Sequence, residues 1–477
     1  MSAAKLLSAA VVCMLGASLC GTAPATSATR VDSVALARNV LAELVRIDTV
    51  EPAGSTQAAQ VLAEHFKAAG FPSEDVQILA PKEHPQKANL VVRLRGRGTG
   101  KPILWMAHLD VVAADAAEWS VAPFRLSERE GWLYGRGTAD MKGEIAAIVA
   151  ALIRLKREGF TPDRDILAAF TADEEAAGRV NGVRWLLAQH RSLFDVALAI
   201  NPDGGGGVMV DGQRRYYKVQ TAEKAYATYT LSASDAGGHS SRPRPGNPIY
   251  RLAAALVRLD AHRFEPRLSA TTRAFFRDGA ALEPEPLRSD MLALGVDQPT
   301  ASAFERMSTR PALDALIRTT CVATLLEAGE AENALPQSAR ATIQCRLLPD
   351  EDPHNVLATL RRVIADPSVE VAVAKPPLIS PETVPDPHVL GAIRTVVTDM
   401  WGPLPVVTGM DAGGSDAVFT RAAGIPTYGA GSIFEEAEDD RHHGRDERIE
   451  ARAFEQGIDF TCRLMRALSA MKATSES

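Results

Sequence analysis

The chain has 477 residues, a length that predicts two or three domains and a large core. Hydrophobic residues make up 46% and charged residues 23% of the chain, which is typical of globular proteins. The formal net charge of −7 gives no indication of nucleic acid or an anionic membrane as a partner.

The first 28 residues have the features of a signal peptide. Lys5 precedes an apolar run at residues 6–20, and small residues at Ala23, Ala25 and Ala28 offer cleavage sites of the A-x-A kind. The run is shorter than the roughly twenty residues that span a bilayer, so a membrane anchor is disfavoured. We expect export to the periplasm or the outside, and no stable membrane insertion after cleavage.

Cleavage would leave three cysteines, Cys321, Cys345 and Cys462. Three cysteines allow at most one disulfide, and we expect all three side chains to be buried. No Cys-x-x-Cys pattern indicates a thiolate metal site.

The first half of the chain contains apolar runs that end in polar groups. After expected helices at residues 34–47 and 56–69 and a strand at 89–94, the run at 103–108 ends in His108. The runs that begin at residues 165 and 195 lead to Glu174 and Glu175, and to Asp203. Such runs are typical of buried parallel strands, and open α/β sheets bind ligands at the carboxyl ends of their strands. We therefore expect these side chains to meet.

A glycine-punctuated loop at residues 135–143 holds one carboxylate, Asp140, and precedes a helix expected at 141–158. A single Asp in such a loop is often a turn residue, and the spacing of His108 and Asp110 also occurs by chance. The convergence of the apolar runs favours a site. We interpret His108 and Asp140 as sharing a metal ion, with Asp140 bridging two.

The pattern changes near residue 216. Residues 218–234 alternate like an antiparallel strand, a glycine-flanked loop holds His239, and a helix is expected at 249–259. Residues 261–311 are interpreted as a Pro- and Arg-rich insertion, to which the sequence assigns no role. Strands near 321–326 and 338–348 and a helix at 354–364 complete a small α+β layer. We expect residues 215–375 to form a domain inserted into a catalytic domain made of residues 29–214 and 376–477.

The remaining α/β part contains expected helices at 387–400 and 451–471, a strand at 425–428, and a late histidine pair, His442 and His443. Imidazole and carboxylate ligands without thiolate suit zinc, with cobalt or manganese as substitutes. The charges of Asp140, Glu175 and Asp203, with one hydroxide, balance two Zn²⁺, whereas one ion would leave excess buried negative charge.

Taken in order, these motifs resemble the zinc peptidase superfamily of glutamate carboxypeptidase, aminoacylase-1, carnosinase and succinyl-diaminopimelate desuccinylase. The order is His-x-Asp, Gly-x-x-Asp, Glu-Glu, an acidic residue after the third strand, Gly-Gly-His, and His-x-x-Asp-Glu. The resemblance covers residues 30–470. It implies a mixed central sheet flanked by helices and an inserted α+β, ferredoxin-like domain that acts as a lid and allows a homodimer.

The resemblance also implies roles for the ligand candidates. His108 and Asp203 would hold different zinc ions, Asp140 would bridge them, and two further residues would complete the sets: Glu175 and His443. Glu174 would be the general base, and Asp110 would orient the imidazole of His108. His442 remains an alternative to His443. The resemblance further suggests a cis peptide bond between Asp140 and Met141.

Four positions resemble the family's substrate-binding residues, and a fifth, His239, resembles its oxyanion donor, often supplied by the neighbouring subunit. The four are Arg346, Asn333, Gly414 and Ser415. Arg346 follows Cys345 where the family has Asp-x-Arg, so a surface salt bridge is an alternative role for it.

The sequence thus predicts an exported di-zinc exopeptidase of carboxypeptidase or dipeptidase type that acts on small peptides. The alternative within enzymes is an aminoacylase-like hydrolase of N-acyl amino acids. The alternative of another class is a metal- or peptide-binding protein without catalysis, against which the intact Glu174 argues.

Overall fold

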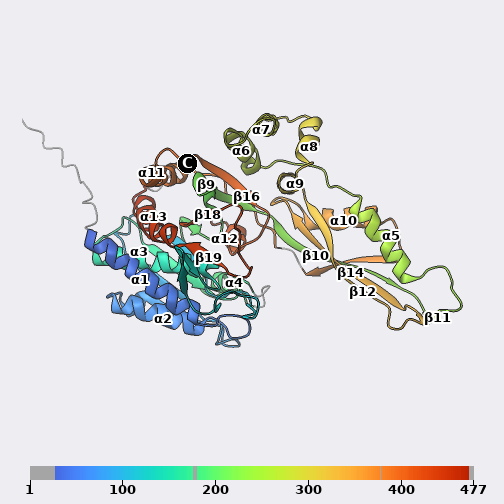
Figure 1. Cartoon of the computed structure of the whole chain (residues 1–477), viewed down its shortest axis with the longest axis horizontal. Helices are drawn as coiled ribbons and strands as arrows, with labels where there is room; N and C mark the ends of the chain where they lie inside the picture. The colour runs from blue at the N-terminus through green and yellow to red at the C-terminus, as the bar shows by residue number, and fades with distance from the viewer. Residues whose placement is uncertain (1–26, 176–179, 376–377, 472–477) are drawn as a thin grey trace, which may run out of the picture.

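The computed structural model describes residues 27–175, 180–375 and 378–471. These ranges form two units, a large sheet covered by helices and a smaller sheet with helices of its own (Figure 1). The predicted signal segment, residues 1–28, lies outside the described part except for its last two residues, which begin helix α1. No described helix has both the length and the apolar character needed to cross a membrane.

The large sheet is mixed and has ten strands in the order β1-β2-β6-β3-β7-β17-β9-β8-β18, with β16 also paired to β9. The strands are β1 (Val76–Leu79), β2 (Asn89–Leu94), β3 (Ile103–His108), β6 (Ile166–Thr171), β7 (Leu198–Asn201), β8 (Gly206–Val210), β9 (Gln213–Glu223), β16 (Val406–Asp411), β17 (Thr427–Gly429) and β18 (Phe434–Glu436). Strands β6, β3, β7 and β17 are parallel neighbours at its centre. This confirms the expected mixed central sheet.

Helices cover both faces of this sheet. On one face lie α1 (Ser27–Arg46), α2 (Thr56–Ala68), α3 (Gly143–Arg157), α11 (Pro387–Trp401) and α13 (Ala451–Ser469), and on the other α4 (Gly182–Gln189), the 3-10 turn η3 (Arg191–Phe194) and α12 (Ala417–Ala422). Side chains alternate between faces along a strand, so Trp105 packs in the first layer and Leu104 in the second. Because both faces are covered, β3 and β6 are buried throughout and read as continuous apolar runs.

The smaller sheet is antiparallel, in the order β12-β14-β10-β15. Its elements are β10 (Ala225–Ser234), α5 (Pro248–Asp260), β12 (Thr320–Ala328), β14 (Ser338–Leu347), α10 (Pro353–Ile364) and β15 (Val369–Lys375). This chain order and strand order are ferredoxin-like, as the resemblance implies. The sequence did not predict strand β15. Only Val369 and Val371 are buried in this strand, so its alternation of apolar and polar residues is short.

Residues 218–234 are not one strand, as the alternation had indicated. The chain leaves the large sheet at the end of β9 and enters the smaller sheet at β10, with Lys224 between them. The backbone N–H of Lys224 donates to the carbonyl oxygen of Asp411 in β16. The hydrogen-bonding partners change at this residue although the side-chain alternation continues, so the second unit begins at Ala225.

The insertion folds into short helices, α6 (Ala270–Gly279), α7 (Leu287–Leu294), α8 (Ala301–Met307) and α9 (Pro311–Ile317), with a 3-10 turn η4 (Ala280–Leu282). They enclose an apolar cluster that includes Phe276, Met291 and Leu294. In Figure 1 these helices lie above the junction of the two units, with α6 against β16. The insertion therefore contacts the large sheet although it belongs to the smaller unit in sequence.

The other short elements are η1 (Ser73–Asp75), η2 (Thr138–Lys142), a sheet of β4 (Ser127–Arg129), β5 (Trp132–Tyr134) and β19 (Arg448–Glu450), and a ribbon of β11 (Gly238–His239) and β13 (Ala334–Leu335). Cys321 and Cys345 lie directly opposite each other in β12 and β14 and form a disulfide. Cys462 is free and buried. The expectation that all three cysteines are buried is wrong for Cys321, which is half-buried because β12 is an edge strand.

Candidate metal centre

Three predicted strands end together at one edge of the large sheet. Strands β6, β3 and β7 are adjacent and parallel. His108 is the last residue of β3, Glu174 and Glu175 follow β6, and Asp203 follows β7. The carboxyl ends of parallel neighbours share an edge, so these four side chains come from separate segments to one place.

Asp140 lies between two histidines. Its Oδ1 atom is 2.9 Å from Nε2 of His108, and its Oδ2 atom is 2.9 Å from Nε2 of His443. The same Nε2 atom of His443 is 3.0 Å from Oε1 of Glu175. The peptide bond between Asp140 and Met141 is cis, as predicted.

The donor atoms form three groups in which all atoms lie within 4.8 Å of one another. The groups are His108 with Asp140 and Asp203, Asp140 with Glu175 and His443, and His108 with Glu174 and Glu175. The first two groups share Asp140 and contain imidazole and carboxylate donors only. Such donor sets fit zinc, cobalt or manganese. The residues present therefore fit two adjoining metal ions joined through Asp140.

The two late histidines have different partners. His443 contacts Asp140 and Glu175, whereas Nδ1 of His442 is 2.8 Å from Oδ1 of Asp440. His442 lines the neighbouring cavity. This placement favours His443 over His442 as a ligand.

The Asp110 carboxylate forms hydrogen bonds with the backbone of Glu174 and Glu175. Its Oδ1 and Oδ2 atoms accept hydrogen bonds from the N–H groups of Glu174, at 3.1 Å, and Glu175, at 2.9 Å. Nδ1 of His108 lies 3.0 Å from the carbonyl oxygen of Asp110 but 3.9 Å from its Oδ1. The contact to the imidazole thus comes from the Asp110 carbonyl group rather than its carboxylate. The carboxylate instead fixes the Glu-Glu pair.

Glu447 joins the Asp140 loop to the His443 loop, a role that the sequence interpretation missed. Its buried carboxylate accepts hydrogen bonds from the N–H groups of Ala139, at 2.8 Å, and Asp140, at 3.0 Å. Arg136 donates to Glu447 at 2.6 Å and to the carbonyl oxygen of His443 at 3.3 Å. The late His-x-x-Asp-Glu motif was the signal that could have shown this role.

Burial makes negative charge costly at this edge. It raises the pKa of Glu174 well above its ordinary value and that of Asp203 to about 8, and neighbouring carboxylates add to both shifts. Burial also acts to raise the pKa of Asp140, but the hydrogen bonds with His108 and His443 outweigh it and lower that pKa. Divalent cations would stabilise such a group of buried carboxylates.

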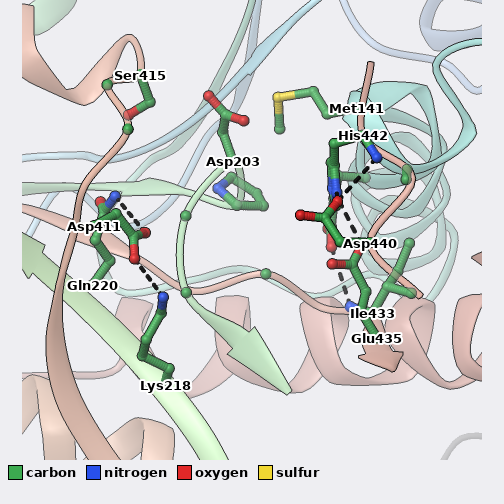
Figure 2. A pocket seen from close by; sticks show the side chains of 18 of the residues that line it. Met141, Asp203, Lys218, Gln220, Asp411, Ser415, Ile433, Glu435, Asp440 and His442 are labelled. Carbon is green, nitrogen blue, oxygen red and sulfur yellow. Dashed lines mark hydrogen bonds and ion pairs between the residues drawn. The ribbon is translucent and has the colours of Figure 1, made fainter. Parts of the chain in front are cut away.

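A cavity of about 410 Å³ adjoins the ligand candidates (Figure 2). Figure 2 shows Asp203 between Ser415 on one side and His442 on the other. Gly414 also lines the cavity, as does an ion pair between Lys218 and Asp411. A concave space next to convergent polar groups is where a small substrate would bind.

Arg346, on β14 of the smaller sheet, lies near Gly414 at the edge of this cavity. A Cβ atom at Gly414 would lie 4.0 Å from Nη1 of Arg346, and the guanidinium lies 4.8 Å from the ring centre of Tyr226. The side chain is half-buried, and burial lowers its pKa. Within the described ranges no carboxylate forms an ion pair with it, so a structural salt bridge does not explain this arginine.

His239 and Asn333 lie together at the far end of the smaller sheet, around β11 and β13 (Figure 1). The N–H of Ser240 donates to the carbonyl oxygen of Asn333 at 3.1 Å. The exposed imidazole of His239 contacts the hydroxyl group of Ser241 at 2.8 Å. Within one chain, neither side chain is brought to the candidate ligands.

Comparison with known families agrees with this arrangement. The profile of the peptidase family M20/M25/M40 matches residues 104–467, a range that contains every predicted metal ligand. The chain belongs to this family. The predicted resemblance to the superfamily of carnosinase and succinyl-diaminopimelate desuccinylase is thereby confirmed.

Among M20 relatives, the N-fatty-acyl-amino acid synthase/hydrolase PM20D1 of Xenopus tropicalis is 30% identical over 375 residues, which are 76% of this chain and 72% of that protein. The M20 metallo-carboxypeptidase Sso-CP2 of Sulfolobus solfataricus superposes with a TM-score of 0.68 at 19% identity, covering 91% of this chain and 99% of that one. Human carnosine dipeptidase 1 gives a TM-score of 0.64 at 14% identity, covering 94% and 100%. At these identities the two structures show a shared fold.

Membership of the M20 family establishes the enzyme class. The chain is a hydrolase that acts on amide bonds, as predicted. The shared fold likewise confirms the α/β class with a mixed central sheet.

Proposed function

We propose that this M20 hydrolase is an exported exopeptidase of carboxypeptidase or dipeptidase type that cleaves small peptides with two zinc ions. The observation that most supports this proposal is the pair of donor groups that share Asp140 beside a cavity. Cobalt or manganese would be substitutes for zinc. The export part of the proposal rests on the apolar run and the small residues at the N-terminus.

In this proposal both ions would share Asp140, with His108 and Asp203 holding one ion and Glu175 and His443 the other. These two sets are the donor groups that share Asp140. This assignment differs from the expectation that His108 and Asp203 hold different ions, because their donor atoms lie in one group with Asp140. Bound there, such ions polarise an amide carbonyl group and lower the pKa of water.

Glu174 is the proposed general base. It accepts a proton from the attacking water and donates it to the nitrogen of the leaving amine as the C–N bond breaks. The Asp110 carboxylate holds the backbone of Glu174 in place, and burial raises the pKa of the Glu174 carboxyl group. An intact base beside intact ligands argues against a binding protein without catalysis.

Arg346, Gly414 and Ser415 are the proposed contacts for the free carboxylate of the substrate. Arg346 has no carboxylate partner in the described part of the chain and faces the Gly414 backbone. A guanidinium without an ion-pair partner matches a substrate carboxylate in charge and shape.

We further propose that residues 215–375 act as a lid and dimerisation domain. His239 and Asn333 lie at its far end, so they would serve the site of the other subunit in a homodimer. His239 would stabilise the oxyanion and Asn333 would hold the substrate backbone.

The second candidate function is the hydrolysis of N-acyl amino acids. The similarity to PM20D1 specifically favours it. Both substrate classes carry an amide bond next to a free carboxylate, so the Arg346 side of the cavity suits either. They differ only on the acyl side, where a peptide has an α-ammonium group.

A substrate panel separates the two. Dipeptides and N-acyl amino acids with the same carboxyl-terminal residue should be compared by kcat/KM, with carboxyl-amidated versions as controls. We expect dipeptides to be preferred by at least about tenfold, and amidation to abolish turnover. A preference for N-acyl amino acids would establish the second function, and no turnover of either class would contradict both.

A further inference from the structure

Two consecutive charged residues are fully buried where the chain passes from one sheet to the other. Glu223 ends β9, and Lys224 precedes β10; their exposed fractions are 0% and 1%. Buried charges are costly unless they are paired and hydrogen-bonded, so each must have strong partners. Those partners lie in different units.

Glu223 contacts the large-sheet unit. Its Oε2 atom accepts hydrogen bonds from the N–H of Ser415 at 2.8 Å and from its hydroxyl group at 2.9 Å. Its Oε1 atom lies 3.0 Å from Nη1 of the buried Arg421. Asn201, at the end of β7, donates to the Ser415 hydroxyl at 3.0 Å. Ser415 is thus held firmly on the side of the metal-ligand strands.

Lys224 contacts the other unit. Its ammonium group donates to the carbonyl oxygens of Ala315, at 3.0 Å, and Arg318, at 2.8 Å, both at the carboxyl end of α9. Its third bond, at 3.1 Å, goes to the hydroxyl group of Thr320, the first residue of β12. Thr320 lies directly opposite Arg346 in the neighbouring strand β14. Lys224 therefore holds the segment beside Arg346.

The insertion adds contacts across the same junction. The hydroxyl groups of Thr271 in α6 and Thr221 in β9 are 2.9 Å apart, and both residues are buried. Leu316 of α9 packs on Ala222 and Met410 of the large sheet. Helices α6 and α9 thus join the two units on either side of Lys224.

We propose that Lys224, together with the helical insertion, is a positioning element that holds Arg346 against Gly414 and Ser415. The insertion, to which the sequence assigned no role, would then keep Arg346 of the smaller unit beside Gly414 at the edge of the cavity. This inference rests on the proposed role of Arg346 and Ser415 in binding the substrate carboxylate.

The test uses the Lys224→Met variant of the full-length, metal-loaded enzyme. Methionine is unbranched and one atom shorter than lysine, and it cannot donate to the three oxygens. KM for a substrate with a free carboxylate should rise about 10- to 100-fold, because small displacements of a binding group have effects of this size. The kcat value and the metal content should change little, since the candidate ligands lie elsewhere. Lys375→Met, an exposed lysine in β15 of the same unit, is the matched control and should behave as wild type.

If Lys224→Met does not fold, Thr271→Val tests the same junction, because it removes only one hydroxyl contact. It should also raise KM more than it lowers kcat. Unchanged KM in a folded Lys224→Met variant would overturn the inference, as would a fall in kcat as large as the rise in KM.

The carboxylate assignment itself is tested separately by Arg346→Gln and by the amidated substrate on wild-type enzyme. If wild-type enzyme does not discriminate against the amide, the proposed carboxylate site is wrong. If it does, and Arg346→Gln loses this discrimination while Lys224→Met keeps it, only the positioning role of Lys224 is refuted.

Discussion

Replacing Glu174 by Gln is expected to lower kcat about 10²- to 10⁴-fold, the usual contribution of a general base. Glutamine keeps the shape of the side chain, and its backbone N–H can still donate to Asp110. It cannot accept the proton of the attacking water at neutral pH. Single-turnover and steady-state kinetics on a good dipeptide substrate would measure the loss.

Metal content distinguishes the two possible roles of Glu174. The side chain forms a donor group with His108 and Glu175, so the geometry also allows it to be a ligand. As a base, Glu174→Gln should retain the full metal content of the wild type. Loss of metal would reverse the assignment within the Glu-Glu pair. Glu438→Gln, at an exposed acidic position, is the matched control and should keep both activity and metal.

Replacing His239 by Ala is expected to lower kcat about 10²- to 10³-fold, the typical effect of losing one oxyanion donor. The imidazole lies in β11 at the far end of the smaller sheet, away from the candidate ligands of its own chain (Figure 1). The variant should therefore keep its metal. A donor so placed would act on the site of a second copy, and subunit mixing tests this arrangement.

Equal amounts of inactive His239→Ala and Glu174→Gln subunits, refolded together, should regain up to about a quarter of wild-type activity. Half of the dimers would be mixed, and each mixed dimer would contain one complete site. Mixed dimers without activity would show that His239 acts within its own chain. Wild-type activity of His239→Ala alone would remove the residue from the mechanism.

The ligand-bearing strands could be predicted because β3 and β6 are buried on both faces and carry uninterrupted apolar runs up to their polar ends. The division between the two sheets at Lys224 could not be predicted. Alternation continues on both sides of it, and the partner strands that separate the two sheets come from distant parts of the chain.

The hydrogen bonds between side-chain carboxylates and backbone N–H groups could not be predicted from the sequence either. The Asp110 carboxylate reaches the N–H groups of Glu174 and Glu175 because of the path of the loop after β6. Glu447 reaches the N–H of Asp140 for the same kind of reason. Residue type indicates that a carboxylate is present, whereas only the fold determines which donors surround it.

The most direct measurement of the central claim is the metal stoichiometry of the protein after reconstitution with zinc and removal of free ions. Two donor groups that share Asp140 predict close to two zinc ions per chain, and the same measurement on Asp140→Ala should show that binding is largely lost. A stoichiometry near zero in the wild-type protein, or an unchanged metal content in Asp140→Ala, would contradict the account.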